Sequence, residues 1–109
     1  MQMNPSPREF NEALEEYIVT FPNHSRLIEY LVKRYDVETQ KIIESELSAA
    51  VKTTEDYLWS QSSGVEWSEV FELKLFNHVK SSHSWLEASG FSRLLSFSKW
   101  LCWHEGLNA

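Results

Sequence analysis

The side chains most capable of chemistry gather near the C-terminal end, in the stretch SFSKWLCWHEGLNA over residues 96–109. Trp100, Cys102, Trp103 and His104 fall within five positions there, and Cys102 is the only cysteine of the chain. A thiol beside an imidazole can act as a nucleophile with its base, or as two ligands of a zinc ion. Whether these side chains can act together depends on the helix that carries them.

Helical geometry separates the thiol from the imidazole. At about 100° per residue, Cys102 and His104 point to nearly opposite sides of a helix. Without residues from elsewhere in the chain, they form neither a nucleophile–base pair nor a pair of metal ligands. His78 and His83 are five positions apart, which suits no common zinc spacing. We therefore expect no metal and no cofactor. Cys102 is expected to be a small buried residue, and His104 a cation favoured by the end of its helix.

The two tryptophans of this segment point away from the face expected to enter the core. That core face consists of Phe91, Leu94, Leu95, Ser98, Leu101 and Cys102. Trp100 and Trp103 lie on the other side, near Arg93 and Lys99. One interpretation is that they pack against another helix. The other is a contact surface, because tryptophan and arginine are enriched among the residues that dominate binding energy.

Two further observations bear on this aromatic face. Lys99 and Trp103 are four residues apart, so a cation–π contact between them is a structural alternative to binding. Trp59 also falls nearly opposite the apolar stripe of its own segment. The predicted partner-binding residues are therefore Trp100, Trp103, Arg93, Lys99 and Trp59.

Helices are predicted throughout the chain to position these residues. Apolar residues recur at three- and four-residue spacing, which is typical of amphipathic helices. Ser6 and Glu9 predict a capping box at the start of the first helix, and Asp36 predicts a cap for the third. Gly106 predicts the end of the last helix. The predicted helices run from residue 7 to just before Pro22, and over residues 25–35, 37–59, 66–80 and 91–105.

Some boundaries leave alternatives open. The third helix is expected to be continuous and about 36 Å long at ~1.5 Å per residue, although a break at Thr53 is an alternative. Ser63 with Glu66, and Ser84 with Glu87, read as two more capping boxes. Gly90 is expected to kink or end a short turn before the last helix.

Residues 66–80 are the hardest segment to interpret. Their apolar side chains point in nearly every direction around a helix, which predicts a central helix surrounded by others. Phe71, Leu73 and Leu75 also alternate with charged residues as a strand would. A lone strand has no partner elsewhere in the sequence, so the helix is preferred.

Composition supports one helical domain over residues 1–109. Of 109 residues, 42% are hydrophobic and 14% aromatic, which is ample for a core, while three glycines and three prolines are few for an all-β protein. The fold class predicted is all-α, a single compact bundle of four to five helices. No apolar run approaches a membrane span, no secretory signal is recognisable in MQMNPSPREF, and one cysteine suits the cytoplasm.

The net charge of the chain limits the classes of partner that we expect. The net charge is −6, and residues 1–60 hold eleven acidic against six basic residues. Without a basic stripe, direct binding of nucleic acid is not expected. Rows of acids, Glu9, Glu12 and Glu16 in the first helix and Glu66, Glu69 and Glu72 in the fourth, are read as solvated faces. The alternative is a negative surface for a basic partner or an imitation of nucleic-acid phosphates.

The sequence thus predicts a small acidic intracellular binding module. It carries no glycine-rich phosphate loop, nucleophile elbow or metalloprotease pair. We expect it to act by occupying a macromolecular partner, as an inhibitor, an immunity protein or a phage or mobile-element accessory protein does. The alternative is a homo-oligomer that uses its tryptophan face as a subunit interface or apolar ligand pocket. An enzyme based on His78, His83 or His104 is the third interpretation.

Overall fold

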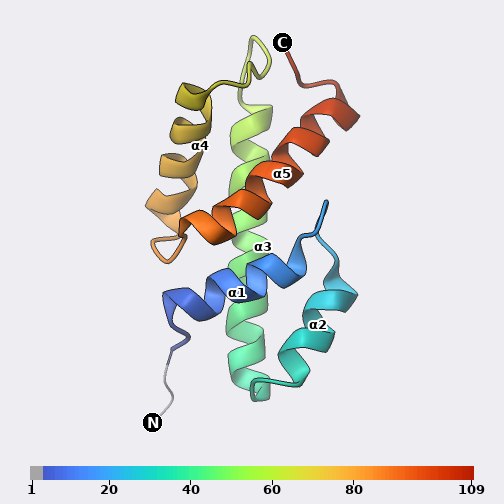
Figure 1. Cartoon of the computed structure of the whole chain (residues 1–109), viewed down its shortest axis with the longest axis vertical. Coiled ribbons are helices and arrows are strands. Elements are labelled where there is room, and N and C mark those ends of the chain that lie inside the picture. The colour runs from blue at the N-terminus through green and yellow to red at the C-terminus, as the bar shows by residue number, and fades with distance from the viewer. Residues whose placement is uncertain (1–3) are drawn as a thin grey trace.

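The computed structural model describes residues 4–109, and these form five α-helices. They are α1 (Pro7–Tyr17), α2 (His24–Val32), α3 (Val37–Trp59), α4 (Glu69–Ser82) and α5 (Ala88–Glu105) (Figure 1). Within the described residues no strand forms, and only two isolated β-bridges occur, Ile18 with Pro22 and Val65 with Asn108. The all-α bundle is confirmed, and none of these helices is long and apolar enough to cross a membrane.

The long helix α3 is the central element, and the other four helices all pack against it (Figure 1). One stripe along it is buried throughout and consists of Ile43, Leu47, Ala50, Thr54 and Leu58. Asp36 caps the first turn by accepting a hydrogen bond from the amide of Thr39. The hydroxyls of Thr53 and Thr54 donate to carbonyls one turn back instead of capping a new helix, so α3 is continuous as predicted.

The first two helices form as predicted but end earlier. Ser6 and Glu9 make the expected capping box of α1. The helix then stops at Tyr17, because Ile18 adopts an extended conformation and the chain turns back through the Ile18–Pro22 bridge. Phe21, which the longer predicted helix would have included, is therefore left half-exposed outside it. Asn23 caps α2, which begins at His24 and stops at Val32 instead of residue 35.

The prediction for α4 is wrong in two respects. The helix starts at Glu69 with Ser68 as its cap, so the expected Ser63–Glu66 box does not form. Residues before it remain a loop, held where Val65 exchanges backbone hydrogen bonds with residues 107 and 109. The helix is also not surrounded, because Leu75 and Val79 alone are fully buried along it. The strand alternative fails as well.

The last helix is longer than predicted. It begins at Ala88, and Gly90 lies inside it instead of kinking or ending a turn. Glu87 is the N-cap but makes no side-chain cap, so the expected Ser84–Glu87 box is absent. Gly90 is buried where α5 crosses α1, and a methyl group there would collide with the Asn11 side chain. Gly106 ends the helix in the left-handed conformation, as expected, with φ of 69°.

Candidate partner-binding surface

A groove opens between α4 and α5. The two helices leave the short turn that joins them and diverge across α3 (Figure 1). The helix α4 packs chiefly on α3 and not on α5. The gap between α4 and α5 is therefore filled by side chains and not by close backbone packing. The groove has a volume of about 460 Å³. Its lining consists of Glu69, Glu72, Leu73, Phe76, Ala88, Phe91, Ser92 and Leu95, and is mostly apolar.

The floor and the α4 wall of the groove are made by large apolar side chains. The rings of Phe76 and Phe91 meet edge to face with centroids 4.9 Å apart, near the turn between the helices. Leu73 is 59% exposed on the wall, and Val70, one turn earlier on the outer side of α4, is 64% exposed. Leu75 packs into the core instead. The excess of apolar residues on α4 therefore forms an uncovered face.

A charged contact lies at the other end of the groove. Nζ of Lys99 is 3.6 Å from a carboxylate oxygen of Glu72, and 5.6 Å from the ring centroid of Trp67. Trp67 in turn donates from its indole nitrogen to the side-chain oxygen of Asn108 at 3.0 Å. Lys99 of α5 is thus held beside Glu72, a residue of the groove lining on α4. The cation–π contact of Lys99 is with Trp67, whereas the sequence offered Trp103 as an alternative.

The five predicted binding residues have different surroundings. Lys99 lies beside Glu72 of the groove lining, and Trp103, one turn later on α5, is 73% exposed. Trp100 is partly buried, and Arg93 reaches the carbonyl oxygen of Ile18 at 3.4 Å. Trp59, the last residue of α3, is 56% exposed. Trp100 and Arg93 thus contact their own chain, whereas Trp103 and Trp59 are open to solvent.

Trp100 takes part in an aromatic stack instead of an open face. Its ring centroid is 5.4 Å from that of Phe21, 6.3 Å from that of Phe97 and 4.8 Å from that of His104. Trp100 is therefore packed against other side chains, which was the first of the two interpretations of the sequence. Trp103 is exposed, as the second interpretation, a contact surface, requires.

No reactive site forms around the thiol. Cys102 is fully buried, and its burial raises the pKa of the thiol, which keeps it protonated and unreactive. His104 lies on another side of α5, against Trp100. Across residues 4–109, no three histidine, cysteine, aspartate or glutamate side chains are grouped as metal ligands would be.

A buried polar network that sequence reasoning missed surrounds His83. Its Nδ1 lies 2.8 Å from Glu46 Oε1, and its Nε2 lies 3.0 Å from the Thr53 hydroxyl. Trp85 donates to the same Glu46 oxygen at 2.9 Å. The Thr53 hydroxyl also donates to the carbonyl oxygen of Ala49 at 2.9 Å.

This network ties α3 to the turn that sets the course of α4 and α5. Burial raises the pKa of Glu46, but the hydrogen bonds from His83 and Trp85 outweigh it and leave that pKa below the ordinary value. All the polar atoms involved have partners within the described structure. The arrangement fits a structural role, because its groups already satisfy one another. No pattern in the sequence places Glu46 beside His83.

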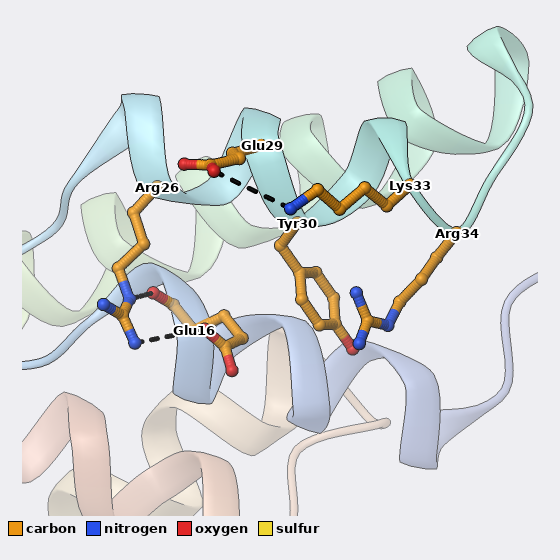
Figure 2. Close-up of a pocket in the computed structure, with 6 residues that line it drawn as sticks. All are labelled: Glu16, Arg26, Glu29, Tyr30, Lys33 and Arg34. Carbon is orange, nitrogen blue, oxygen red and sulfur yellow. Dashed lines mark hydrogen bonds and ion pairs between the residues drawn. The ribbon is translucent and has the colours of Figure 1, made fainter.

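A second, polar concavity lies between α1 and α2 (Figure 2). Its charges are largely paired within the chain. Arg26 binds the carboxylate of Glu16 at 3.2 Å, and Lys33 lies 3.7 Å from Glu29. The guanidinium of Arg34 lies 4.1 Å from the ring centroid of Tyr30. Three cations and two acids line the concavity, so pairing leaves it a net charge of only +1.

Comparison of the chain with protein-family models, with curated proteins and with solved structures finds no match in any of the three. Any functional conclusion must therefore come from the geometry described above.

Proposed function

We propose that this protein acts by binding a helical segment of a partner protein in the groove between α4 and α5. The supporting observation is that Leu73, a large apolar side chain of α4, lines an open groove while remaining 59% exposed and outside the core. Contiguous apolar surface that a chain leaves exposed is typical of an interaction site. No histidine or cysteine lines this groove, which favours binding over catalysis.

A helix is the occupant that fits best. Both walls of the groove are helices, and rows of side chains three and four apart on such walls receive the ridges of a third helix. Partner helices of this kind bind through an apolar face with anchors at the same spacing. Burial of a side chain such as Leu73 would contribute about 1.5–3 kcal/mol before the cost of association.

This proposal belongs with proteins whose action is to occupy a partner, such as inhibitors, immunity proteins and accessory proteins of mobile elements. The net charge of −6 makes a protein a better partner than a nucleic acid. A buried free thiol suits the cytoplasm, where we propose that the partner is met.

The test is selection followed by mutation. Helix-forming peptides would be selected from a random display library on the intact protein, and their affinity measured by calorimetry. Leu73→Ser should weaken binding by about tenfold or more, because it removes an apolar anchor from the groove. The matched control is Val32→Ser, since Val32 on α2 has the same 59% exposure. Equal affinity for the two variants, or no selected peptide, would contradict the proposal.

Self-association is the second candidate, and the exposed ring of Trp103 supports it. In that case sedimentation equilibrium should give a dimer mass at micromolar concentration, and Trp103→Ala should restore the monomer. A monomer at all concentrations would exclude this candidate.

A further inference from the structure

The charge of the α4–α5 groove selects among helical partners. The charged residues in its lining are Glu69 and Glu72, both in the first turn of α4. Lys99 lies beside Glu72, whereas Glu69 makes no ion pair with any residue of 4–109. A partner that covers the groove must therefore leave Glu69 without water or supply a cation. Covering an unpaired carboxylate costs binding energy, and pairing it recovers that energy.

The opposite end of the groove is different. Around Phe76, Ala88 and Phe91 no charged side chain lines it. Lys80 is close, but its ammonium donates to the carbonyl oxygen of Leu86 at 2.6 Å and lies 5.6 Å from the Phe76 ring centroid. The ammonium of Lys80 thus lies next to that end and is directed at its own chain, so a second cation there would be repelled.

We propose that the occupant is an amphipathic helix with lysine or arginine beside its apolar face, concentrated at the end that lies next to the start of α4. This inference rests on the proposed function, since it names the kind of helix that the groove receives. A second copy of this chain is a poorer occupant, because it brings a further net charge of −6 and another unpaired Glu69.

Two synthetic peptides of 18 residues would test it. Both share one leucine face, and they differ in carrying lysine or glutamate beside that face at one end. Binding of labelled peptide to the intact protein is followed by fluorescence anisotropy at low and high salt. The lysine peptide should bind about tenfold more tightly at 50 mM salt, and the advantage should shrink at 300 mM because screening weakens exposed charge pairs.

Variants of the protein locate the effect. Glu69→Gln should lower the ratio of the two peptides' affinities, lysine over glutamate, several-fold. The matched control is Glu38→Gln, because Glu38 is also an exposed acid in a first turn, that of α3, and has the same helix-dipole contribution. Leu73→Ser should weaken both peptides.

The failures are distinguishable. If both peptides bind equally and both lose affinity with Leu73→Ser, the groove binds helices but the charge inference is wrong. If neither binds, or if binding ignores Leu73→Ser, the proposed function itself fails. A dimer in sedimentation that competes with the lysine peptide would overturn the inference in favour of a second copy.

Discussion

Asn11 shows at the scale of single residues how α1 is fixed to the rest of the molecule. Its side-chain nitrogen donates to the carbonyl oxygens of Pro7 and Trp85, each at 2.8 Å. Its oxygen accepts from the amide of Glu87 at 3.0 Å. A buried amide with every group satisfied holds one geometry, because any shift would leave a polar atom without a partner. Gly90 is the residue that leaves room for it.

Gly90→Ala should destabilise the protein, although alanine normally improves a helix interior by up to about 1 kcal/mol. The added methyl group would collide with the Asn11 oxygen and lie 3.2 Å from a methyl carbon of Leu14. We expect the free energy of unfolding in urea to fall by about 1–3 kcal/mol. The comparison is Gly106→Ala, where no atom lies within 4 Å and only the left-handed backbone opposes alanine. A stabilised Gly90→Ala protein would refute this close approach.

Glu46→Gln should reveal the network around His83 through its pH dependence. The pKa of Glu46 is lower in the folded protein than the ordinary value of about 4.3, so its carboxylate stabilises the fold above that pH. This contribution is lost as the pH falls through the lowered pKa. The substitution should therefore cost about 1 kcal/mol at pH 6 and less below about pH 4. Urea unfolding at both pH values measures it, and a difference that grows on acidification would contradict the assignment.

At the scale of elements, α5 carries one exposed and one packed tryptophan within a single turn, Trp103 and Trp100. Trp103→Ala should leave the free energy of unfolding within about 0.5 kcal/mol of the original, because the ring is mostly in water. Trp100→Ala should cost about 1–3 kcal/mol, because it removes stacking on Phe21 and Phe97. Chemical denaturation compares the two. Acrylamide quenching of single-tryptophan variants should be strong for Trp103 and weak for Trp100, and the reverse order would refute the assignment.

The sequence predicted those features of the helices that depend on residues close together in the chain. Capping by Ser6 and Asp36, the length of α3 and the glycine end of α5 are set by neighbours in the chain, and all were predicted. The exposure of much of α4 to solvent was not predicted. Apolar residues on every side of a helix predict burial only if other helices surround it, and their number is a property of the tertiary structure.

The candidate site was predicted less well than the fold. Helical phase correctly set Trp103 apart from the core stripe and Cys102 within it. It could not show that Phe21, displaced by the early end of α1, covers Trp100. Nor could it show that the open face of the molecule belongs to α4. Both depend on contacts between residues far apart in sequence.

At the scale of the whole molecule, the groove should be a binding surface and not a stability determinant. Leu73→Ser and Val70→Ser together should leave the melting temperature within a few degrees, because neither side chain is in the core. Differential scanning calorimetry measures this. A fall of about 10 °C or more would show that α4 needs these residues for folding, and would remove the support for the proposed function.

The contact between α1 and α5 also has a consequence for the time course of folding. These helices lie at opposite ends of the chain, and Asn11 of α1 bonds Trp85, 74 positions away in the turn that leads into α5. On a ribosome adding about 5–20 residues per second, α1 emerges first and waits several seconds for its partner. During that interval the side of α1 that α5 will cover remains open to water and to other chains. Refolding from urea should likewise be slower than in bundles with only neighbouring contacts, because a long loop must close before α1 is docked.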